Sequence, residues 1–164
     1  MPIVRRLAVL AIVAILALSN VSHAQKSGGT LRFYLFDSPG TMSIHEEVTI
    51  AALAPMMAVF NNLVTFDPKI PQISAATIVP ELATSWSWDA TRTKLTFQLR
   101  QGVQWHDGQN FTARDVKCTW DMLLGKSTEK LRINPRKAWY RNVEEIAVDN
   151  EHQATFKLKQ PQPS

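Results

Sequence analysis

The first group of residues that could do chemistry is His45, Glu46 and Glu47, with Thr49 close behind. A zinc-protease helix needs a second histidine four residues after the first, so that both imidazoles share one face. Thr49 occupies that position in this chain. The spacing therefore does not match a zinc site, and we predict neither a metal site nor a cofactor here.

A second pair of candidate catalytic side chains is His106 and Asp107, which Gly108 follows directly. The Asp-Gly pair is typical of a turn, because glycine adopts backbone angles that other residues avoid. We interpret His106 as a residue that flanks a turn, and we predict no catalytic residue and no enzyme activity. A secreted hydrolase or metal-dependent enzyme that uses His45, Glu46, Glu47 and His106 remains an alternative, and it requires these groups to converge in the fold.

The amino-terminal segment has the three parts of a secretory signal. Arg5 and Arg6 precede an uncharged apolar run over residues 7–18, and Ser22-His23-Ala24 ends in a small residue. A membrane anchor is the alternative, but it needs about 20 apolar residues, and this run is shorter. We therefore predict a signal peptide over residues 1–24, cleavage before Gln25, and a periplasmic protein.

The charge of the chain is modest once this segment is removed. The sequence has 18 Lys and Arg against 14 Asp and Glu, a formal net charge of +4. Loss of Arg5 and Arg6 leaves 16 against 14, or +2. These basic residues are scattered along the chain, so we predict no nucleic-acid partner and expect a monomer.

The single cysteine and the tryptophans are interpreted as structural. Cys118 cannot form an internal disulfide, and helical spacing places it opposite the apolar stripe that begins at Ala113. We interpret it as a thiol covered by a second layer, next to Met122. The tryptophans are assigned to core packing rather than to a ligand platform; they are Trp86, Trp88, Trp105, Trp120 and Trp139.

The pattern of apolar residues predicts a mixed α/β (α+β) fold. Alternation predicts strands over 31–35 and 63–66, a hairpin from 85–88 and 95–99, and a second hairpin from 146–148 and 154–158. Pro55 suits the first position of a short buried helix that ends at 61–62, residues 69–77 form a loop, and 79–82 form a helical turn. Thr112 and Asp115 resemble a capping box for a helix that runs to Leu124 and ends at Gly125.

Several segments occur together in a recognisable order, and over residues 28–164 the chain resembles the family 5 extracellular solute-binding proteins of peptide, oligopeptide and nickel ABC importers. The segments that carry this resemblance are Gly28–Phe33, Asn62–Asp67, Val79–Ala83, Leu95–Arg100, Val103–Gly108, Phe111–Ala113, Asp115–Lys117, and Phe156–Leu158 with Pro161. Two departures are Ser43-Ile44, where an Asp-Pro pair is usual, and Arg114, where an acidic residue is usual.

The resemblance implies a periplasmic-binding-protein-like fold of two lobes that close on a ligand and deliver it to a membrane permease. It assigns residues 25–60 to the start of lobe I and residues 61–164 to a truncated extra domain, so that the chain is an amino-terminal fragment. We expect such a fragment to bind ligand poorly by itself.

Within this frame the stretch after Ser43-Ile44 borders the ligand cleft, which makes His45, Glu47 and Thr49 the candidate ligand-binding residues. An ordinary solvated loop is the alternative for each of them. The ligand is a peptide or a related small solute; nickel chelates, sugars and opine-like compounds remain open. A small stand-alone secreted interaction domain, built from the two hairpins, is the remaining alternative function.

Overall fold

The computed structural model of the chain describes residues 28–30, 32 and 34–162. Contacts divide the chain into two compact units, Met1–Tyr34 and Leu35–Ser164. The predicted signal peptide lies outside the described residues, as do Leu31 and Phe33 of the first predicted strand. No helix in the described ranges is long and apolar enough to cross a membrane.

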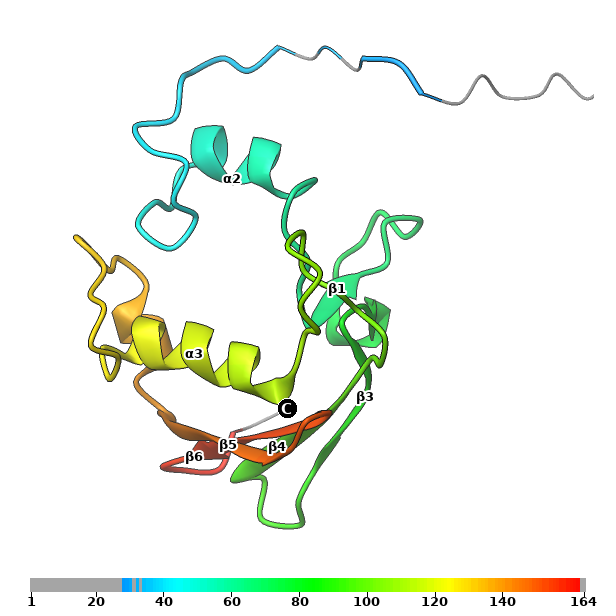
Figure 1. Cartoon of the computed structure of the whole chain (residues 1–164), viewed down its shortest axis with the longest axis vertical. Helices are drawn as coiled ribbons and strands as arrows, with labels where there is room; N and C mark the ends of the chain where they lie inside the picture. The colour runs from blue at the N-terminus through cyan, green and yellow to red at the C-terminus, as the bar shows by residue number, and fades with distance from the viewer. Residues whose placement is uncertain (1–27, 31, 33, 163–164) are drawn as a thin grey trace, which may run out of the picture. The chain divides into compact units, whose positions relative to one another are not determined.

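The second unit contains helices and antiparallel strands (Figure 1). In chain order its elements are α2 (Ile50–Met56), β1 (Val64–Phe66), the 3-10 turn η1 (Ala75–Thr77), β2 (Ile78–Pro80), β3 (Ala83–Trp88), β4 (Lys94–Leu99), α3 (Ala113–Leu124), the 3-10 turn η2 (Lys137–Tyr140), β5 (Val143–Asn150) and β6 (Gln153–Leu158).

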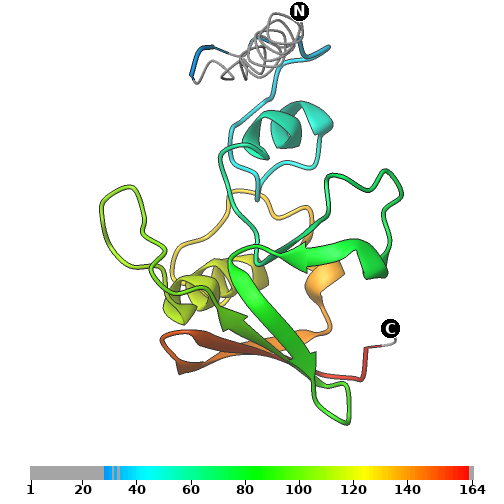
Figure 2. The same cartoon turned by 90° about the vertical axis from the view of Figure 1, so that its right-hand side faces the viewer.

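Four of the strands form one antiparallel sheet in the order β3-β4-β6-β5 (Figure 2). Both predicted hairpins are confirmed. Trp86 lies opposite Phe97 in the first hairpin, and Ile146 lies opposite Phe156 in the second. Strands β4 and β6 join the hairpins, and they place Leu95 opposite Phe156. Phe156 therefore sits where the two hairpins meet.

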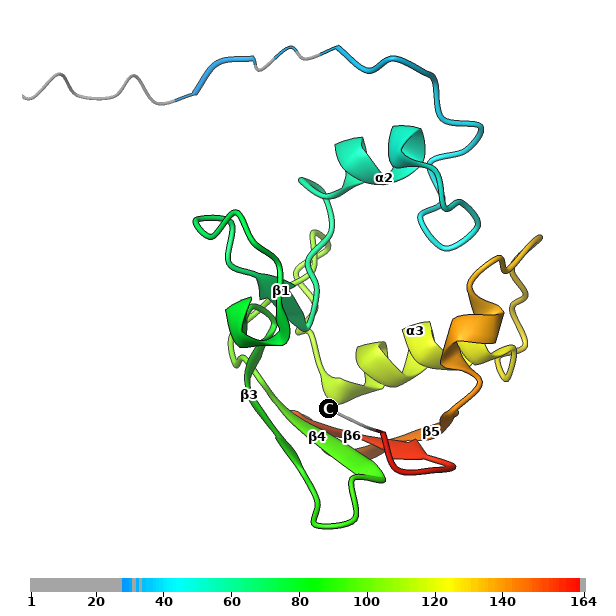
Figure 3. The same cartoon turned by 180° about the vertical axis from the view of Figure 1, so that it is seen from behind.

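The hydrophobic core lies between this sheet and α3, which runs across one face of it (Figure 3). Alternate strand residues point to that face because the side-chain period of a strand is two. The buried cluster consists of Ala83, Phe97, Leu99, Phe111, Ala113, Val116, Ile146, Ala154 and Phe156. The rings of Phe97 and Trp120 meet the Phe156 ring edge to face, with centroids 5.3 Å and 5.0 Å away. The core thus depends on a three-ring contact centred on Phe156.

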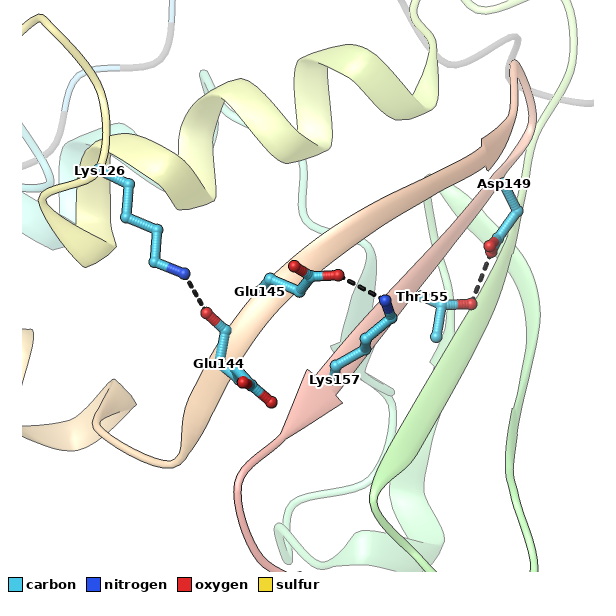
Figure 4. A network of polar contacts seen from close by, with 6 residues as sticks. All are labelled: Lys126, Glu144, Glu145, Asp149, Thr155 and Lys157. Carbon is cyan, nitrogen blue, oxygen red and sulfur yellow. Dashed lines mark hydrogen bonds and ion pairs between the residues drawn. The ribbon is translucent and has the colours of Figure 1, made fainter.

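The opposite face of the sheet is polar. Thr155 Oγ1 donates to Asp149 Oδ2 at 2.6 Å, and Lys157 Nζ donates to Glu145 Oε1 at 2.5 Å (Figure 4). The hydrogen bond between Lys157 and Glu145 is the main cause of a lowered pKa at Glu145 and of a raised pKa at Lys157. The sheet is therefore apolar toward α3 and polar on its other side, a common arrangement for antiparallel sheets.

The ends of α3 are those that the sequence predicts. Thr112 Oγ1 accepts from Arg114 N at 3.3 Å, and Asp115 Oδ2 accepts from Thr112 N at 2.7 Å, which completes the capping box. Gly125 ends the helix with φ of 74°, a left-handed angle at which glycine is favoured. The turn predicted from Asp107-Gly108, next to His106, is confirmed as well, since Gly108 N donates to Trp105 O at 2.9 Å.

The predicted helix that begins at Pro55 is wrong. Helix α2 begins at Ile50, after the cap residue Thr49, and Pro55 lies near its end. A proline there lacks the N–H that would bond to the residue four positions earlier, and this loss agrees with the end of the helix one residue later, at Met56. The predicted burial is wrong too, because Met57, Val59 and Phe60 follow the helix and are 80%, 55% and 47% exposed.

The predicted helical turn over 79–82 is also wrong. Residues Ile78–Pro80 form β2, which pairs with β1 so that Thr65 lies opposite Val79. Pro80 is the last residue of this two-stranded sheet, and proline is tolerated at strand ends and edges. The predicted loop over 69–77 contains the short turn η1 at its end.

The predictions for Cys118 and for three tryptophans need correction. Cys118 is exposed, because no second layer covers the outer face of α3 in the part of the chain that the structure describes. Trp86 and Trp120 pack against the core. Trp88, Trp105 and Trp139 are 39%, 47% and 71% exposed, so their main role is not core packing.

Candidate functional site

The predicted ligand-binding residues lie in one loop that leads into α2. Its first half is a turn in which Glu46 N donates to Ser43 O at 3.1 Å. Its second half ends at Thr49, whose Oγ1 accepts from Ala52 N at 3.4 Å and caps α2. The loop is therefore held at both ends by local hydrogen bonds, which limit where His45 and Glu47 can point.

A distant segment, residues 132–136, binds the same loop. Arg132 N donates to Glu46 Oε1 at 2.5 Å, and Arg132 Nε lies 3.9 Å from Glu46 Oε2. Arg136 Nη1 donates to the backbone oxygen of Ile44 at 2.6 Å. Two arginines thus hold the turn from outside, one through a carboxylate and one through a carbonyl. One partner in each hydrogen bond is charged, the Glu46 carboxylate as acceptor in the first and the Arg136 guanidinium as donor in the second, so both bonds are stronger than neutral ones.

His45 lies in the electrostatic field of this contact. Its pKa falls below the usual 6.5, first because the imidazole is half-buried and second because Arg136 is positively charged nearby. Both causes disfavour the protonated ring. Unfolded chains take up this proton more readily than the folded protein does. His45 therefore contributes stability above its ordinary pKa that is lost as the pH falls below about 6.5.

Replacing Arg136 with glutamine is expected to raise the pKa of His45, because the substitution removes the smaller of the two causes. NMR titration of the imidazole resonances measures this change. The Arg136→Lys variant keeps the charge and should keep the pKa low, which separates charge from a general loosening of the loop. Arg114→Gln, a charge change of the same size on α3, is the matched control. An unchanged titration of His45 in Arg136→Gln would contradict the assignment.

Glu47 and Thr49 contact one another at the end of the loop. Thr49 Oγ1 donates to Glu47 Oε2 at 3.5 Å, and a methyl group on Gly40 would come within 3.2 Å of Glu47 Oε1. Thr49 is therefore committed to the helix cap, while Glu47 retains hydrogen-bonding capacity. The structure brings His45, Glu47 and Thr49 into one loop, and their role in binding stays a prediction.

The arginines of this site were missed by the sequence analysis. Arg132 and Arg136 are 86 and 92 residues from their partners, and no local pattern connects them to the loop. His106, the fourth residue of the hydrolase alternative, is an exposed turn residue. Within residues 28–30, 32 and 34–162, no group of three or more His, Cys, Asp or Glu side chains could hold a metal ion.

Comparison with known proteins gives this arrangement a context. The family model described as "Bacterial extracellular solute-binding proteins, family 5 Middle" matches residues 77–164, which is more than half of the chain. Those residues include the whole four-stranded sheet, α3 and the segment that carries Arg132 and Arg136.

Individual relatives have several kinds of ligand in their names. The chain is 31% identical over 116 residues to di/tripeptide-binding protein 2 of Pseudomonas aeruginosa (strain UCBPP-PA14). This match covers 63% of this chain and 21% of that protein. It is 43% identical over 54 residues to the periplasmic alpha-galactoside-binding protein of Rhizobium meliloti (strain 1021), or 32% of this chain and 8% of that protein. The chain thus spans about a fifth of the length of the first relative.

The fold matches part of a solved periplasmic binding protein. The structure of MoaA from A. tumefaciens R10, in complex with mannopinic acid, superposes with a TM-score of 0.63 at 23% identity. The match covers 75% of this chain and 24% of that one. The predicted mixed α/β fold of the periplasmic-binding-protein type is therefore confirmed.

Proposed function

Because the chain belongs to the bacterial extracellular solute-binding proteins of family 5, we propose that it captures a small solute for an ABC importer and hands it to the membrane permease. The family match over residues 77–164 carries this proposal. Peptides are the first solute class we propose, because the first relative compared above is named for di- and tripeptides. The galactoside-binding relative makes sugars the alternative class.

The capture mechanism we propose is closure of two lobes on the ligand. Residues 25–60 would begin lobe I, and residues 61–164 would belong to the extra domain. The loop at His45, Glu47 and Thr49 would border the cleft and offer hydrogen bonds to a peptide backbone, either directly or through water. Support for this placement comes from the contacts that fix the loop against Arg132 and Arg136, because a ligand binds more tightly to a preorganised site.

No covalent chemistry enters this mechanism. The relatives compared above are named as binding proteins, and binding followed by release requires no nucleophile. We further propose that residues 1–24 direct the chain to the periplasm, where it acts as a monomer without a nucleic-acid partner.

Deletion of the gene in the source bacterium tests the function. Uptake of a panel of labelled di- and tripeptides, raffinose and mannopinic acid is measured in the deletion strain and in a strain that carries the restored gene. Loss of uptake of one class, with recovery on restoration, supports the proposal and identifies the ligand. Unchanged uptake of every compound would exclude peptides, galactosides and opines as the ligand.

The predicted cleft residue is tested in the same restored strain. The His45→Ala variant should reduce uptake of the identified ligand, and the matched exposed-residue variant His106→Ala should not. Equal uptake by both variants, at equal protein levels, would remove His45 from the site.

A further inference from the structure

A surface cavity lies at the carboxyl end of α3, and residues from four parts of the chain converge on it. The end of α3, the turn η2, the start of β5 and the residue after β6 line a volume of about 330 Å3. This size is at the lower limit of the range of small-molecule sites, which runs from about 300 to 1,000 Å3. None of His45, Glu47 and Thr49 lines it, so the cavity is separate from the loop described above.

The lining of this cavity is strongly basic. It contains four cations against one carboxylate, Glu144, a balance of +3; the cations are Lys126, Lys137, Arg141 and Lys159. Within the described ranges none of the four forms an ion pair with a carboxylate. Lys126 Nζ donates to the backbone oxygen of Glu144 (Figure 4), which is a neutral acceptor, so this hydrogen bond does not cancel the positive charge of Lys126.

The fold explains two of these cations and not the others. Lys126 follows the carboxyl end of α3, and the Lys137 Nζ lies near Gly125, 3.4 Å from where a methyl group would be. Cations are favoured at this end of a helix by the helix dipole. Arg141 and Lys159 come from other segments, and their like charges repel those of Lys126 and Lys137. A negatively charged ligand would remove that repulsion.

One part of the cavity lining, which we call its floor, consists of apolar and aromatic side chains. Leu124, Tyr140 and Val143 are partly buried there. The Tyr140 ring packs edge to face on Trp120 with centroids 4.9 Å apart, so it is anchored to the core. Inorganic phosphate would interact with the cations of this site but has no apolar part to contact Leu124, Tyr140 and Val143.

We propose that this cavity binds a small organic anion. The carboxylate or phosphate group of this anion lies among Lys137, Arg141 and Lys159, and the short apolar part of the same molecule lies on Leu124 and Val143. The planar guanidinium of Arg141 can donate two parallel hydrogen bonds to either head group.

NMR titration of the full chain tests the site with three probes that share one body. Phenyl phosphate and benzoate carry the two head groups, and phenol carries none. We expect at least one anion to shift the amide signals of residues 124–126, 137–144 and 159 and to saturate them, with a dissociation constant of about 1 mM or tighter. Phenol should not saturate them, and added salt should weaken the anions. The preferred head group distinguishes a carboxylate from a phosphate ligand.

The affinity of charge variants for the preferred anion then shows which cations contribute to binding. Arg141→Glu should weaken the preferred anion at least about tenfold, and the neutral variant Lys159→Gln should weaken it less. Arg92→Glu, an equal charge change on the turn between β3 and β4, is the control. The proposal is overturned if neither anion saturates the signals, if the shifts lie elsewhere, or if Arg92→Glu weakens binding as much as Arg141→Glu. Amide spectra of each variant without ligand verify that it is folded.

Discussion

Replacing Phe156 with alanine is expected to lower the free energy of unfolding by about 3–5 kcal/mol. The side chain is only 6% exposed, and it contacts the rings of both Phe97 and Trp120. It also pairs across the sheet with Leu95 on one side and Ile146 on the other. Removal of the ring therefore opens a cavity where both hairpins and α3 meet. Urea unfolding followed by circular dichroism measures the change.

Two further variants make this result interpretable. Phe36→Ala removes the same ring from a side chain that is 74% exposed, and it should change stability by less than about 0.5 kcal/mol. Phe156→Leu keeps most of the volume and should cost less than Phe156→Ala. Since domains are stable by about 5–15 kcal/mol, Phe156→Ala should lose a large part of the total. A loss below about 1 kcal/mol would show that this junction is not the centre of the core.

The elements that the sequence predicted correctly depend on local patterns. The two hairpins follow from apolar residues that alternate on either side of a turn, and Trp86 and Phe97 needed only that turn to meet. The ends of α3 follow from Thr112, Asp115 and Gly125, whose hydrogen bonds all lie within a few residues. Such signals are contained in a short window, so sequence alone is sufficient to interpret them.

The errors concern residues that suit more than one environment. Proline is allowed at the start of a helix, and it is tolerated at the end of a short edge strand. Pro55 and Pro80 could therefore be assigned only with knowledge of their neighbours, and β2 finds its partner in β1 across the intervening loop. The exposure of Cys118 and Trp139 likewise depends on whether another layer covers them, which the local sequence does not encode.

In the candidate site too, some residues could be selected from the local sequence and others only from the fold. His45, Glu47 and Thr49 could be selected because they are neighbours in a polar loop of a recognised family. Arg132 and Arg136 act on that loop from a segment about 90 residues away. The lowered pKa of His45 follows from this contact and from burial, so it too required the fold.

Limited digestion with chymotrypsin is expected to cut after Phe60 more than about 100-fold faster than after Phe97. Phe60 lies in an exposed stretch directly after α2, where Met57 and Val59 are exposed as well. Phe97 is 7% exposed and its strand is paired on both edges. Cutting after Phe60 needs only a local opening, whereas cutting after Phe97 needs the sheet to unfold. Mass spectrometry of the early fragments gives both rates.

The Glu46→Gln variant links this digestion to the candidate site. It removes the charge that attracts Arg132, so the loop before α2 should open more often and cutting after Phe60 should become faster. Cutting after Phe97 should not change, because the core contains none of these contacts.

Equal rates of cutting after Phe60 and Phe97 in the unchanged protein would contradict the expected order of the two rates. They would favour an autonomous interaction domain in which α2 is fixed as firmly as the sheet. Fast cutting after Phe60 alone favours the assignment of residues 50–60 to a lobe. The exposed apolar side chains of these residues would then need further partners to cover them.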